Sequence, residues 1–76
     1  MATVFVLVET LPGSIQETKA LIEGEEVKRV LAVTGTYDLF VEVEGPTIAD
    51  ALKWVRERIL PIQGLRRTET MVAVDV

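Results

Sequence analysis

The sequence predicts an α+β fold in the order β-α-β-β-α-β, and three observations lead to it. Four short runs rich in Val, Leu, Ile and Phe alternate with two segments of helical spacing. Glycine or proline interrupts the chain near the ends of these segments. With 76 residues in total, the elements have to share one core, so we expect a single domain over residues 1–76.

A strand and a short helix are predicted in the first third of the chain. Residues 3–9 are rich in β-branched and aromatic side chains on both alternating sets of positions, which is typical of a central strand covered on both faces. Ser14 and Glu17 have the spacing of a capping box, so we expect a helix over 15–23. Gly24 stands where a left-handed cap would end this helix.

A β-hairpin is predicted over residues 27–44, the stretch around which the rest of the chain is organised. Its strands are expected over 26–34 and 38–44, because both runs are rich in Val, Leu and Phe. The five residues at 34–38 contain a glycine, an acid and the only tyrosine of the chain. We therefore expect the polar chemistry of this protein at the hairpin turn.

The last third predicts a second helix and a final strand. Thr47 is the expected N-cap, with Asp50 three residues later, and apolar residues then keep helical spacing to position 59. Trp54 falls at the margin of that apolar stripe, so we expect it to pack at an edge, with a subunit contact as the second interpretation. Pro61 ends the helix, and the final strand is expected over 65–76.

Elements in this order are typical of the ferredoxin-like fold, a four-stranded antiparallel sheet with both helices on one face. The other face of the sheet is then uncovered and apolar. The residues expected there are one set of alternate positions of the first strand, Phe40, and either Met71 and Ala73 or Val72 and Val74. Because an exposed apolar patch indicates an interface, we expect a second copy to pack sheet to sheet across a two-fold axis.

Composition argues against several classes of function. Eight Lys and Arg against twelve Asp and Glu give a net charge of −4, without a basic run that would bind nucleic acid directly. The chain has no Cys and no His, so we expect no metal, no cofactor and no catalytic residue. Its longest apolar runs are too short to span a membrane and its start lacks the pattern of a signal peptide, so we expect a cytoplasmic protein. The arginines expected on solvated surface are Arg56, Arg58, Arg66 and Arg67.

Asp38 is the strongest polar candidate, and two interpretations of it stay open. It can cap the hairpin turn through its own backbone, or it can bind a ligand ammonium group beside Gly35, where a backbone without a side chain allows close approach. Tyr37 is either a packing aromatic or a ligand contact. Thr68 and Thr70 share one face of the last strand, either as ordinary strand residues or as the lining of a small polar site.

Two motifs resemble the effector domain of the Lrp/AsnC transcription regulators, called the RAM (regulation of amino-acid metabolism) domain. The first reads Val27-x-x-Val30-x-x-Val33-Thr34-Gly35-x-Tyr37-Asp38 and leads into an apolar strand. The second reads Gly64-Leu65-x-x-Thr68-x-Thr70 and opens the final strand. The likeness covers nearly the whole chain.

The resemblance implies a non-enzymatic domain that binds amino-acid effectors between the subunits of a ring of dimers. Each dimer would be a dimeric α+β barrel closed by facing sheets. The ligand-binding residues that it implies are Gly35, Thr36, Tyr37, Asp38, Thr68 and Thr70, completed by residues of a partner chain.

Members of this family typically carry a helix-turn-helix before the effector domain, whereas here the first strand begins within the first few residues. We therefore expect no DNA-binding domain, and a regulatory role exerted through partners such as a full-length relative in mixed oligomers. Two alternatives stay open. One is an adaptor module that oligomerises without a ligand, and the other is an enzyme of the dimeric α+β-barrel kind, against which the absence of histidine speaks.

Overall fold

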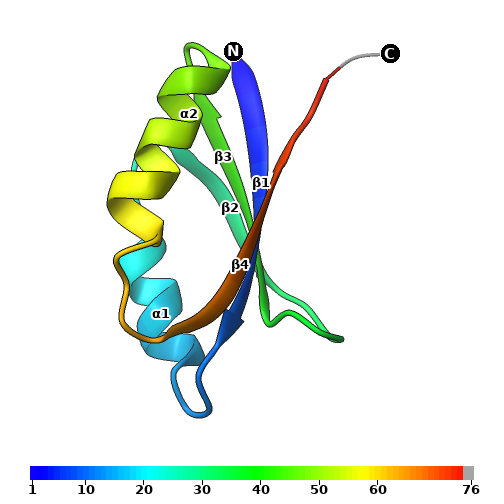
Figure 1. Cartoon of the computed structure of the whole chain (residues 1–76), viewed down its shortest axis with the longest axis vertical. Helices are drawn as coiled ribbons and strands as arrows, with labels where there is room; N and C mark the ends of the chain where they lie inside the picture. Colours follow the sequence, from blue (N-terminus) through cyan, green and yellow to red (C-terminus); the bar gives the residue numbers. More distant parts are fainter. Residues whose placement is uncertain (75–76) are drawn as a thin grey trace.

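Both helices lie on one face of a single four-stranded antiparallel sheet (Figure 1), so the predicted ferredoxin-like fold is confirmed. The computed structural model describes residues 1–74. The elements are β1 (Ala2–Thr10), α1 (Ile15–Ile22), β2 (Val27–Ala32), β3 (Leu39–Gly45), α2 (Ile48–Trp54), the π-helical turn η1 (Val55–Ile59) and β4 (Leu65–Val72). The last strand was predicted to run to 76; it ends at Val72, and residues 75–76 lie outside the described part of the chain.

The sheet has the strand order β2-β3-β1-β4, so β1 is a central strand as predicted. It pairs antiparallel with β3 on one side and with β4 on the other. Alternate residues of β3, and of β1 from Val4 to Thr10, face the helices and are buried. The core comprises Val4, Val6, Val8, Ile22, Leu39, Val41, Val43, Ala51, Trp54, Val55 and Ile59.

The other face of the sheet carries an apolar centre, because β1 is apolar on both sets of positions. Phe5 lies opposite Met71 in the β1–β4 register, which decides for Met71 and Ala73 over the alternative pair. The rings of Phe5 and Phe40 meet across β1 and β3 with centroids 5.1 Å apart. Both helices of the described chain lie on the opposite side (Figure 1), so they do not cover these side chains.

The two cap predictions for α1 are wrong. Ser14 precedes the helix, but its side chain makes no cap hydrogen bond. Its amide donates to the Leu11 carbonyl at 3.0 Å in a tight turn, which leaves it at φ −103° and ψ 2° instead of the extended conformation that a capping side chain needs. Gly24 is not in the left-handed region, because α1 already ends at Glu23 in an extended conformation.

The predicted start of α2 is confirmed. Thr47 Oγ1 accepts a hydrogen bond from the Asp50 amide at 3.1 Å, and the Thr47 hydroxyl donates to the Asp50 carboxylate at 3.0 Å. Trp54 corrects a prediction, because it is only 8% exposed and belongs to the core. The end of α1 covers it, since the missing side chain of Gly24 would start 3.4 Å from the Trp54 ring.

Gly45→Ala tests the packing of α2 on the sheet. A Cβ at this buried position would lie 2.9 Å from the Ala51 amide nitrogen, a backbone atom that cannot turn aside. We expect a loss of roughly 1–3 kcal/mol in the free energy of unfolding, and a melting temperature lower by about 4–8 °C for each kcal/mol. Gly24→Ala is the matched control, since its Cβ would meet only ordinary contacts; equal melting of the two variants would contradict the packing described.

Candidate functional site

The loop between β2 and β3 is fastened to the end of β1. The Val33 amide donates to the Asp38 carbonyl at 2.9 Å and closes the loop, while the Asp38 amide donates to the Val8 carbonyl at 2.8 Å. Gly35 has φ +112°, in the left-handed region that favours glycine. The glycine of the hairpin motif is therefore required by the backbone of this loop, whatever else it does.

The carboxylate of Asp38 bonds to β1 and not to its own turn. Its Oδ2 accepts hydrogen bonds from the Thr10 amide at 2.8 Å and from the Thr10 hydroxyl at 3.2 Å. The interpretation of Asp38 as a cap of its own backbone is therefore wrong. Because both bonds end on Oδ2, the tie to Thr10 leaves Oδ1 unused and fixes the orientation of the carboxylate.

An open hollow of about 420 Å³ brings part of the predicted site together beside this carboxylate. Its lining combines the hairpin loop with the end of β1, the turn that follows it and the start of β4. The residues are Glu9, Thr10, Leu11, Pro12, Gly13, Ile15, Gly35, Thr36, Asp38 and Arg66. Thr10 and Arg66 were not predicted as site residues. The antiparallel pairing of β1 with β4 could have indicated them, because it places the end of β1 beside the start of β4.

Tyr37 lies on the far side of the sheet from the helices, outside this hollow. Its hydroxyl donates to Glu69 Oε1 at 3.1 Å, and the guanidinium of Arg67 lies 5.3 Å from the centre of its ring. Arg67 also pairs with Glu9 at 3.3 Å. Desolvation of the hydroxyl, followed by the hydrogen bond to Glu69 and the charge of that residue, raises the pKa of Tyr37 above its ordinary value.

Thr68 and Thr70 share one face of β4, as predicted, but neither lines the hollow beside Asp38. The register places them opposite Val8 and Val6, whose side chains are buried against the helices. They therefore lie on the helix side of the sheet. Within one protomer the structure brings Gly35, Thr36 and Asp38 together, and it leaves Tyr37 and the two threonines apart from them.

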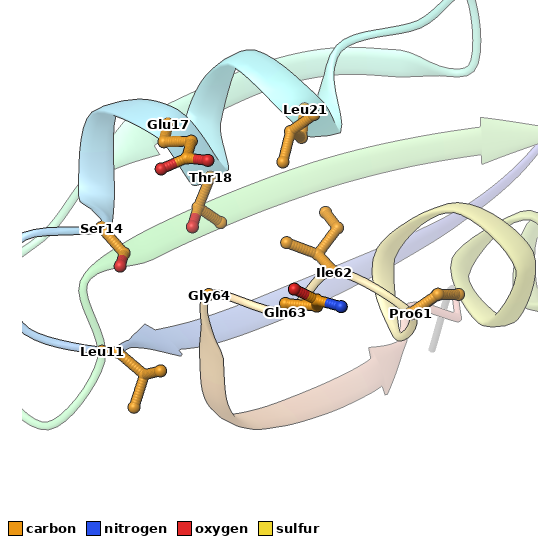
Figure 2. A pocket seen from close by; sticks show the side chains of 9 residues that line it. All are labelled: Leu11, Ser14, Glu17, Thr18, Leu21, Pro61, Ile62, Gln63 and Gly64. Carbon is orange, nitrogen blue, oxygen red and sulfur yellow. The ribbon is translucent and has the colours of Figure 1, made fainter.

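A second hollow of about 560 Å³ lies between α1 and the segment that leads into β4 (Figure 2). None of the predicted site residues lines it. Its lining consists of Leu11, Ser14, Glu17, Thr18, Leu21, Pro61, Ile62, Gln63 and Gly64. Gly64 has a packing role here, since a Cβ would lie 2.9 Å from the hydroxyl of Thr18.

Neither hollow contains an acidic cluster suited to a metal. Among residues 1–74 the structure places no three Asp, Glu, His or Cys side chains together as metal ligands. In the same part of the chain, no helix is both long enough and apolar enough to cross a membrane. The candidate site is thus a hollow with charged residues at its lining.

Comparison with known proteins identifies the family of this chain. Residues 3–76 match the family model of the Lrp/AsnC ligand binding domain. The chain belongs to this family. A relative of the Lrp/AsnC domain is an uncharacterised HTH-type transcriptional regulator of Pyrococcus horikoshii, 26% identical over 73 residues that cover 95% of this chain and 46% of that protein. The chain therefore spans about half the length of the curated relatives that it matches.

Two solved structures share the fold of this chain. The protein TTHA0845 from Thermus thermophilus is 34% identical, with a TM-score of 0.91 over 100% of this chain and 96% of that one. The complex of the transcriptional regulator NMB0573 with L-Met, from Neisseria meningitidis, is 17% identical, with a TM-score of 0.79 over 97% of this chain and 50% of that one. At that identity the second structure shows a shared fold.

Titration of Tyr37 tests the cluster on the uncovered face. Since it is the only tyrosine, ultraviolet absorbance against pH reports its ionisation alone. We expect a midpoint above the ordinary value of about 10, and a lower midpoint in Glu69→Gln, because the carboxylate that disfavours the phenolate is then gone. Glu17→Gln, at a distant exposed position, should leave the midpoint unchanged. Equal midpoints in the wild type and Glu69→Gln would contradict the contact between Tyr37 and Glu69.

Proposed function

We propose that this Lrp/AsnC domain binds an amino acid in the hollow beside Asp38 and regulates transcription through its partners. The observation that carries the proposal is the carboxylate of Asp38, which Thr10 holds in place through Oδ2 while Oδ1 stays unused by that tie. A fixed carboxylate is a strong acceptor for a ligand ammonium group. Gly35 and Thr36 complete the same wall of the hollow.

The dimensions of the hollow support a small ligand. Its volume of about 420 Å³ is within the usual range of roughly 300–1,000 Å³ for small-molecule sites. The hollow is open on one side, so a second chain has to close it before a ligand is enclosed. The L-Met complex of the Neisseria meningitidis regulator, which has the same fold, supports an amino acid as the ligand class.

In the proposed oligomer, the remaining predicted residues would contact a second chain. In the proposed assembly the uncovered sheet faces pack together in dimers, and the dimers form a ring. Tyr37, Thr68 and Thr70 lie outside the hollow of their own protomer, so we assign them to contacts with a neighbouring subunit or with the ligand held there. We propose that this chain forms mixed oligomers with a full-length regulator of the same family, about twice as long as this chain. The full-length regulator would bind DNA, and the ligand would act on it through the shared oligomer.

A panel of amino acids tests ligand binding through thermal melting. A ligand at 100 times its dissociation constant adds about 2.7 kcal/mol to the free energy of unfolding. For a domain of this size that raises the melting temperature by roughly 10–20 °C, since about 1 kcal/mol corresponds to roughly 4–8 °C. Absence of a shift with any of the standard amino acids would contradict the proposal and favour an oligomerisation module that binds no ligand.

Asp38→Asn separates the proposed charge of the site from its structural tie. The amide oxygen still accepts from Thr10, but the negative charge is lost. We expect the ligand-induced shift to disappear while the melting temperature without ligand changes little. Glu25→Gln removes one charge at an exposed position away from the hollow and should keep the full shift. Equal ligand-induced shifts of the melting temperature in Asp38→Asn and the wild type would contradict the role assigned to Asp38.

Met71→Glu tests the proposed sheet-to-sheet dimer. Met71 is 37% exposed on the uncovered face, opposite Phe5, whereas Leu52 is 38% exposed on α2. A carboxylate at 71 would be buried without a partner in the dimer, which is costly. Light scattering should therefore give the 8.4 kDa monomer for Met71→Glu and an oligomer for Leu52→Glu. A monomeric wild type at micromolar concentration would refute the assembly.

A further inference from the structure

Arg66 occupies an irregularity in the pairing of β1 with β4. Glu9 pairs with Arg67, but the next residue, Thr10, pairs with Leu65, so the register shifts by one residue. Arg66 is the extra residue on β4 and has no partner on β1. Such bulges change the direction of a side chain and are common beside binding sites.

The shift places Arg66 in the lining of the hollow that also contains Asp38. Its neighbour Arg67 is engaged elsewhere, by Glu9 and by the ring of Tyr37. The ion pairs among residues 1–74 join Lys28 to Glu44, Arg29 to Glu42 and Arg67 to Glu9. Within the described chain, the guanidinium of Arg66 is therefore not committed to a carboxylate.

Thr10 connects the two charged groups. It lies at the register shift that sets Arg66 apart, and it donates both hydrogen bonds to Asp38 Oδ2. Thr10 itself is only 9% exposed. Thr10 therefore holds the carboxylate of Asp38 in place directly. It also lies at the register shift that brings Arg66 to the lining of the same hollow.

An α-amino acid carries the complementary pair of charges on neighbouring atoms of a small molecule. Its ammonium group suits Asp38, and its carboxylate suits the planar guanidinium of arginine, which can donate two parallel hydrogen bonds. Glu9 also lines the hollow, but its carboxylate is paired with Arg67. We propose that Arg66 binds the α-carboxylate of the amino acid whose ammonium group Asp38 binds, so that the hollow selects intact zwitterions.

This inference rests on the proposed function and is tested by titration calorimetry on the full chain. The probes are the amino acid that gives the largest melting shift in the panel and its α-carboxamide, which keeps the ammonium group but lacks the carboxylate. We expect the wild type to bind the acid at least about tenfold more tightly than the amide, the ratio that one charged hydrogen bond supplies.

Arg66→Gln should weaken binding of the acid by about tenfold or more and leave the amide nearly unchanged, so that the preference disappears. Arg66→Lys keeps the charge but not the planar guanidinium, so its affinity for the acid should lie between those of the wild type and Arg66→Gln. Arg56→Gln is the matched control on the second helical segment and should bind like the wild type. Melting of each variant without ligand verifies that it folds.

The outcomes separate the two proposals. If no amino acid binds the wild type, the proposed function fails and the role of Arg66 fails with it. If the wild type binds and Arg66→Gln keeps both the affinity and the preference for the acid, only the assignment of Arg66 is overturned. The same holds if the wild type binds acid and amide equally.

Discussion

The antiparallel pairing of β1 with both of its neighbours positions the other main features of this structure. Because β3 and β4 run opposite to β1, the starts of both strands meet the end of β1. Asp38 precedes β3 and Arg66 lies near the start of β4, so both come to the same end of the sheet. A charged site can then be built from segments that are distant in the chain, and the hydrogen bonds from Thr10 to Asp38 hold it there.

The two faces of the sheet differ, because the helices bury one of them and leave the other uncovered. Alternate valines of β1 and β3 are buried by the helices and form the core. The uncovered face has an apolar centre around Phe5 and Phe40, with ion pairs from Arg29 to Glu42 and from Arg67 to Glu9 beside it. Such exposed pairs add little stability. In the proposed sheet-to-sheet packing, their charges would influence which partner surface can cover the apolar centre.

Predictions that depended on local chemistry succeeded where tertiary contacts did not compete. Thr47 caps α2 as its spacing indicates. Ser14 has an equally good cap signature, but its backbone is held in the tight turn that leads from β1, so the side chain makes no cap bond. Trp54 is in the core because the end of α1 closes over it, which the spacing of α2 alone does not reveal. Its indole Nε1 has no hydrogen-bond partner, a cost that burial of the large ring has to exceed.

The order of the elements, the central position of β1 and the uncovered face could be predicted from the sequence alone. These follow from hydrophobic periodicity and turn residues, which act over a few neighbouring positions. The hairpin loop as the place of polar chemistry stays a prediction. The folded structure was needed to show that Asp38 bonds to Thr10, that Tyr37 lies outside the hollow beside Asp38, and that Arg66 lines this hollow together with Asp38. Those outcomes depend on strand register, and a shift of one residue, as at Thr10, moves a side chain from one face to the other.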